Sequence, residues 1–174
     1  MTIKVFMQIR QVVVLADESS EVNDFLRDLE QRGLEIRRSN ASEILNEVAT
    51  TEGGRWGGPD RLILCDQNFD SKPFGSVIVR EAAKNGCGIL IGSDRLVRVA
   101  EEMTAECTLS EETRRELASE ALYWCISREA EKLSALQGES PRYLVQTYEK
   151  VQDLRYGENW HQKASLYQKP GGLG

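Results

Sequence analysis

The stretch RLILCDQNF, residues 61–69, runs four apolar residues directly into an aspartate. Two other short apolar runs have the same form, VVVLAD at 12–17 and CGILIGSD at 87–94. Runs of this length without polar alternation are typical of strands that are covered on both faces, as in parallel sheets. LEIRR at 34–38 is more polar and predicts an edge strand.

Segments with apolar residues at helical spacing separate these strands. They are SSEVNDFLRDLEQRG at 19–33, NASEILNEVAT at 40–50, FGSVIVREAAKNG at 74–86 and DRLVRVAEEM at 94–103. Serine or asparagine opens the first two, and glycine closes the first and third, as expected for helix caps. With ECTL at 106–109 as a fifth strand, the alternation predicts a doubly wound α/β domain.

The last third of the chain is expected to be helical. Residues 111–136 predict one long helix that extends the domain, and we place the domain boundary near 137. Beyond it, Ser140 and Pro141 form a cap and first-turn pair, which predicts a further helix over 141–156. Residues 138–174 are therefore interpreted as a helical extension with a disordered end.

Composition narrows the class of protein. The 174 residues carry a net charge of -6, which argues against a nucleic-acid or anionic-membrane surface. The four cysteines lie far apart, as core thiols in a reducing compartment would. No apolar run is long enough to span a membrane, and the charged N-terminal stretch does not resemble a signal peptide. We expect a cytoplasmic protein.

Acidic residues follow the predicted strands. Asp17 and Glu18 come at the end of the run that starts at residue 12, Asp66 ends the run that starts at 61, and Asp94 comes at the end of the run that starts at 87. Parallel strands present their carboxyl ends at one edge of the sheet, so these side chains are expected to converge there. Several carboxylates at one place would repel one another unless they shared a cation such as Mg²⁺. A single aspartate at a strand end is more often a turn former.

Residues 10–130 resemble the receiver domain of two-component response regulators. An acidic pair at 17–18 follows the first strand, as in that family. The Pro-Asp pair at 59–60 precedes a strand that ends on Asp66, which matches the family's phosphoacceptor. NFDSKPFG at 68–75 is similar to the family's loop into the third helix. The resemblance implies a flavodoxin-like, CheY-like sheet of five parallel strands in the order 2-1-3-4-5.

The resemblance also implies roles for particular residues. Asp66 would accept a phosphoryl group from a histidine kinase or small phosphodonor. Mg²⁺ would be held by Asp17, Glu18, Asp66 and the backbone carbonyl of Asn68, and Ser93 would bind the phosphoryl group. The chain would then act in signal transduction through protein–protein interaction, without a DNA-binding output domain and with a kinase or other signalling protein as its partner.

Two departures from the receiver pattern leave a second hypothesis open. The family ends its fifth strand on a lysine before a proline, and ECTLSEE at 106–112 has neither. The predicted helix at 111–136 carries apolar residues on several faces, which indicates a second contact surface. The alternative is an unphosphorylated pseudo-receiver that acts as an interaction or dimerisation module. The predicted helix at 111–136 would then form the contact between two copies of the chain. In either case we expect a binding module rather than a turnover enzyme.

A third hypothesis is a Mg²⁺-dependent nuclease of the PIN or NYN type. Such enzymes also place acids at the ends of parallel strands, and GSD at 92–94 with Asp94 resembles their pattern. The acidic balance of the chain disfavours this hypothesis, because nucleic acid requires a basic groove. His161 is the one histidine and cannot form a metal site or a catalytic pair alone.

Overall fold

The computed structural model describes residues 5–16, 19–51, 56–69, 75–103, 106–154 and 164–169. The chain divides into two compact units, Met1–Cys125 and Ile126–Gly174. This division falls within one long helix. The boundary expected near residue 137 stays a prediction.

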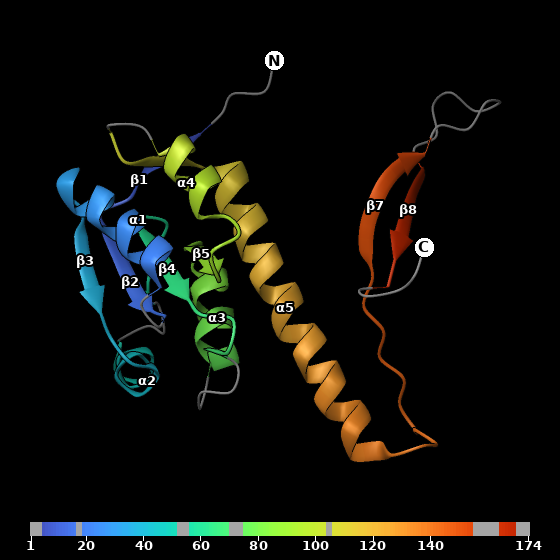
Figure 1. Ribbon diagram of the computed structural model, residues 1–174. Helices are drawn as coiled ribbons and strands as arrows, with labels where there is room; N and C mark the ends of the chain where they lie inside the picture. Colours follow the sequence, from blue (N-terminus) through green and yellow to red (C-terminus); the bar gives the residue numbers. More distant parts are fainter. Residues whose placement is uncertain are drawn as a thin grey trace. The chain divides into compact units, whose positions relative to one another are not determined.

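The first unit contains a parallel sheet of four strands (Figure 1). In sheet order these are β3 (Glu35–Arg38), β2 (Gln11–Leu15), β4 (Arg61–Cys65) and β5 (Gly88–Ile91). All three pairings between neighbours are parallel. The four runs predicted from the sequence are therefore strands of one α/β sheet, and the polar run forms an edge, as expected.

Helices cover both faces of this sheet, because successive side chains of each strand point to opposite sides. One face packs against α1 (Ser20–Gln31) and α4 (Leu96–Glu102), in a cluster that includes Val12, Val14, Phe25, Leu62, Leu64, Leu96 and Val99. The other face packs against α2 (Ala41–Thr50) and α3 (Gly75–Lys84), in a cluster that includes Val13, Leu15, Ile44, Ile63, Cys65 and Ile78.

The expected fifth parallel strand is wrong. The segment forms β6 (Thr108–Ser110), which pairs antiparallel with β1 (Phe6–Gln8) in a separate two-stranded sheet. The order 2-1-3-4-5 would place α4 on the face of α2 and α3, because parallel crossovers are right-handed. Here α4 packs with α1 on the opposite face, so the chain does not return beside β5.

The long helix α5 (Glu111–Gln137) agrees with the range expected for it. Leu117 belongs to the core cluster on one face of the sheet, and Ala121 and Cys125 belong to the cluster on the other. The Arg114 side chain lies close to Gly88 of β5. We infer that α5 runs along the edge of β5, in the place expected for a fifth strand.

In the second unit, the helix predicted over 141–156 is wrong. Residues 141–148 contain no helix, and β7 (Glu149–Leu154) pairs antiparallel with β8 (Ala164–Gln168) (Figure 1). The amide of the Gln137 side chain exchanges hydrogen bonds with the backbone N–H and C=O of Tyr143, both at 2.8 Å. These bonds connect Tyr143 to the last residue of α5. No helix of the described residues is long and apolar enough to cross a membrane.

Candidate functional site

Asp66 lies at the carboxyl edge of the sheet, directly after β4. Its Oδ1 accepts a hydrogen bond from the backbone N–H of Asn68 at 2.8 Å, and its C=O accepts one from the N–H of Phe69. This is the local turn that aspartate commonly forms, and it lets the fully buried Phe69 side chain enter the core. The turn explains why a buried strand ends on a charge.

The rest of the acidic site predicted at this edge is not tested. Asp17 and Glu18 lie outside the described residues, as does His161. Among the residues that the structure describes, no group of three or more histidine, cysteine or acidic side chains could hold a metal ion. The Mg²⁺ site therefore stays a prediction.

Gly92 stands beside Asp66 at the same edge. It follows β5 in register, has a φ of +74° and donates its N–H to the Cys65 carbonyl at 2.8 Å. A Cβ at this position would lie 2.9 Å from the Gln67 side chain, so only glycine fits without a shift. The structure thus places Gly92, and not Ser93, directly after the strand.

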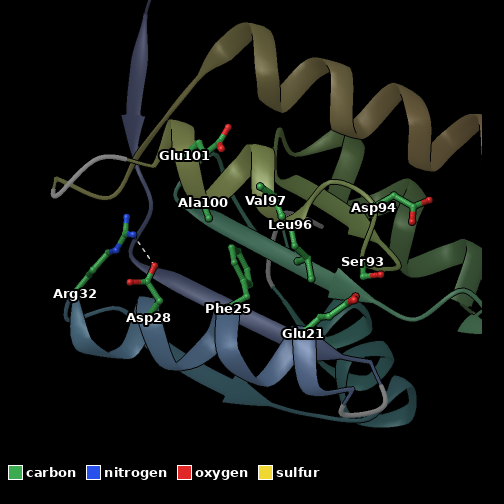
Figure 2. Close-up of a pocket in the computed structure, with 10 residues that line it drawn as sticks. All are labelled: Glu21, Phe25, Asp28, Arg32, Ser93, Asp94, Leu96, Val97, Ala100 and Glu101. Atoms are coloured by element: carbon green, nitrogen blue, oxygen red, sulfur yellow. Dashed lines mark ion pairs between the residues drawn. The ribbon is translucent and has the colours of Figure 1, made fainter.

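Ser93 and Asp94 line a groove of about 840 Å³ between α1 and α4 (Figure 2). The other lining residues come from the two helices and are Glu21, Phe25, Asp28, Arg32, Leu96, Val97, Ala100 and Glu101. Phe25 and Leu96 point toward one another from opposite sides, with Glu21 near Ser93 at one end and Arg32 at the other (Figure 2). Neither Asp66 nor Asn68 lines this groove.

The groove combines an apolar floor with an acidic rim. Phe25 and Leu96 are buried, and the lining contains four carboxylates and a single guanidinium. That guanidinium, on Arg32, pairs with Asp28 at 2.5 Å and donates to the Met103 carbonyl. Because its charge is already satisfied, the groove offers no cation for a phosphate or carboxylate ligand.

A polar network joins α4, β6 and α5. Ser110 caps α5, since its Oγ accepts from the N–H of Thr113 at 3.1 Å. Glu102 accepts from the N–H of Ser110 at 2.9 Å and from the Thr113 hydroxyl. Burial alone would raise the pKa of Glu102, but these hydrogen bonds together hold that pKa below its ordinary value. The network fixes where α5 begins.

Further ion pairs link the same two helices. Arg95 pairs with Glu120, and Arg98 pairs with Glu116. Their side chains are about half exposed, so each pair contributes little to stability. We interpret them as contacts that align α4 with α5, not as a catalytic arrangement.

Arg114 of α5 is only 7% exposed. Its Nη1 donates to the Gly86 carbonyl at 2.9 Å, while its Nε is buried without a hydrogen-bond partner. Burial lowers the pKa of this guanidinium.

The four cysteines are free thiols and all are buried, which confirms their interpretation as core residues.

The sheet with helices on both faces defines the first unit as a doubly wound α/β domain, a class whose ligands bind at the carboxyl edge. Comparison with known protein families shows which family the chain belongs to. The family described as AICARFT/IMPCHase bienzyme matches residues 82–173, which is more than half of the chain. The chain belongs to this family.

Similar proteins agree with the family match. The bifunctional purine biosynthesis protein PurH of Halalkalibacterium halodurans is 40% identical over 104 residues, which cover 56% of this chain and 20% of that protein. PurH of Lysinibacillus sphaericus is 39% identical over 98 residues, covering 55% and 19%. PurH of Bacillus cereus strain B4264 is 37% identical over 102 residues, covering 55% and 20%. The chain spans about a fifth of the length of these relatives.

The family match overturns the resemblance to receiver domains. The expected signalling function, the histidine kinase as partner and the phosphoryl-transfer roles of Asp66 and Ser93 lose their basis with it. The expectation that the chain is no enzyme is also wrong at the level of its family, which is a bienzyme. Placement of α4 on the face of α1 is the structural difference from the receiver order. Self-association through 111–136 stays a prediction.

Sequence reasoning missed most of the groove. Of the residues that line it, the sequence pattern indicates a role only for Ser93 and Asp94, and in both cases a different one. A usable signal was present in the spacing of the acids, because Glu21 and Asp28 are seven residues apart and lie on one face of α1.

Proposed function

We propose that this chain acts in purine biosynthesis as a member of the AICARFT/IMPCHase bienzyme family. The observation that carries the proposal is the match over residues 82–173, which includes β5, α4, β6, α5 and the β7–β8 hairpin. Identities of 39–40% to two purine biosynthesis proteins support it. We thus propose that the chain is part of an enzyme, that it takes part in the two activities in the family's name, and that these activities serve purine biosynthesis.

We further propose that a purine nucleotide binds over the carboxyl edge of β4 and β5. Doubly wound domains bind their ligands at this edge. Here the edge presents the exposed side chains of Gln67 and Asn68, beside the backbone of Gly92. Side-chain amides both donate and accept hydrogen bonds, as recognition of a purine base requires. The α1–α4 groove is less suitable, because its acidic rim would repel a phosphate.

Binding and activity measurements test this proposal. We expect IMP, the purine nucleotide in the family's name, to shift the amide resonances of Gln67 and Gly92 in the full chain. Gln67→Ala should weaken binding, whereas Gln31→Ala, an exposed change on α1, should not. Both activities should be assayed in parallel on the same preparation. Absence of binding and of both activities would refute the proposal.

A separate proposal concerns Mg²⁺ at Asp17, Glu18 and Asp66. Its support is the sequence position of these acids after neighbouring parallel strands. Mg²⁺ should raise the melting temperature of the wild type but not that of Asp66→Asn, which keeps the side-chain acceptor of the turn. An equal response of both proteins would contradict it. We also propose a cytoplasmic location. It is supported by the four buried free thiols, which are typical of a reducing compartment.

A further inference from the structure

We propose that the groove between α1 and α4 binds a basic amphipathic helix from a partner protein. This site is separate from the carboxyl edge at which we place the nucleotide. Three features of the groove support the proposal: its apolar floor, an exposed valine on its wall and carboxylates on both of its sides.

Apolar side chains form the floor and part of one wall of the groove. Phe25 and Leu96 form the floor, and Val97 of α4 is 69% exposed. Val97 is the most exposed large apolar side chain among the described residues of the first unit. Covering it removes apolar surface from water, so an occupant with an apolar stripe is favoured. A helix laid between two helices presents such a stripe.

Acidic side chains flank the groove on both sides. Glu21 and Asp28 stand on the α1 side, and Asp94 and Glu101 stand on the α4 side (Figure 2). Within the described residues, the carboxylates of Glu21, Asp94 and Glu101 make no hydrogen bond or ion pair. The single cation of the groove, Arg32, is engaged by Asp28 and by the Met103 carbonyl. The rim thus complements a positively charged occupant on both flanks.

The acidic residues of each flank are seven positions apart in the sequence. Glu21 and Asp28 are separated by seven helical residues, or about 10 Å along the axis of α1. Asp94 precedes α4 and Glu101 lies near its end, so the opposite flank carries a pair with the same sequence separation. Lysine or arginine residues seven apart on a bound helix have the same axial spacing. An occupant with basic residues on both sides of an apolar stripe therefore matches the groove in chemistry, and it matches the α1 flank in axial spacing.

A pair of designed peptides tests the proposal. The first carries leucine at helical spacing along one face and lysine on both flanks, and the second has glutamate in place of every lysine. We expect the lysine peptide to bind the full chain, to lose affinity as salt rises and to shift amide resonances of α1 and α4. The glutamate peptide should not bind.

Variants separate this groove from general attraction to an acidic protein. The double variant Asp94→Asn/Glu101→Gln should weaken binding about tenfold, since it removes two rim charges. Val97→Ser should also weaken it, because the apolar contact is lost. The control Glu106→Gln/Glu112→Gln changes two exposed acids outside the groove and should leave affinity unchanged.

Several outcomes would overturn the proposal. They are equal loss of affinity in the control variant, binding of the glutamate peptide, and amide shifts confined to surfaces other than α1 and α4. Concentration-dependent self-association that shifts the same amides would instead assign the groove to a second copy of the chain. Because the nucleotide experiment uses other residues and other ligands, either result stands independently of the other.

Discussion

Glu102 should stabilise the junction of α4, β6 and α5, and Glu102→Ala tests its contribution. The substitution leaves the N–H of Ser110 and the hydroxyl of Thr113 without their acceptor in a largely buried place. Two hydrogen bonds to a charged group contribute about 3–6 kcal/mol before the cost of burying the carboxylate. After that cost, we expect a net loss of about 2 kcal/mol of unfolding free energy at neutral pH. Alanine and glutamate are both good helix formers, so helix propensity adds little.

The effect of Glu102→Ala should depend on pH. The pKa of Glu102 is lower in the folded protein than its ordinary value of 4.5, which approximates the unfolded chain. The carboxylate therefore contributes its full stability above that value and loses the contribution as the pH falls through the folded pKa. The difference between wild type and Glu102→Ala should be largest near neutral pH and should narrow in acid.

Urea denaturation followed by far-UV circular dichroism, repeated from neutral to acidic pH, provides the measurement. Glu101→Ala is the matched control, because Glu101 is the preceding residue of α4, is exposed and makes no ion pair within the described residues. Combining Glu102→Ala with Thr113→Val should show a coupling energy, since the two side chains are hydrogen-bonded. Equal losses in the Glu101 and Glu102 variants, or a difference that persists unchanged in acid, would refute this reasoning.

Three further predictions follow from the packing. Gly75→Ala should lower the unfolding free energy measured by urea denaturation by about 1–3 kcal/mol, because the added Cβ would lie 2.1 Å from the Phe69 carbonyl oxygen. An unchanged urea midpoint would contradict this. Arg114→Leu should cost less stability than Arg114→Ala, because leucine fills more of the buried site, and calorimetry that ranks the two variants oppositely would contradict this. The four buried thiols should react with a thiol reagent only upon unfolding, and fast reaction of any in the native protein would contradict their burial.

The central sheet could be predicted from the sequence because its signals are local. The runs at 12–15 and 61–65 contain consecutive large apolar residues, and such runs need cover on both faces. Ser19 and Asn40 accept hydrogen bonds from the first turns of α1 and α2, as their identity predicts. These features depend on neighbours a few residues away.

The errors arose where distant packing decides the structure. Nothing local in DRLVRVAEEM tells on which face of the sheet α4 will pack, and that choice determined where β6 lies. Residues 141–156 contain Val151 and several aromatic residues that favour strands as much as helices, and pairing with β8 decided between them. The groove, for its part, exists only once α1 and α4 lie on the same face.

The receiver resemblance rested on single positions, such as Asp66, that another fold can supply for its own reasons. An aspartate after a buried strand serves equally as a turn former, which is what its hydrogen bond to Asn68 shows. The evidence for the family lies instead in a match that extends over residues 82–173.

The second unit has no buried residue among those described from Ile126 onward. Unfolding of this part therefore brings little additional apolar surface into contact with water, and heat capacity changes scale with that surface. The calorimetric transition of the whole chain should consequently report almost entirely on residues 1–125, and melting of the β7–β8 hairpin should pass with little heat signal. Amide hydrogen exchange, which reads each backbone bond separately, is the method that would detect it.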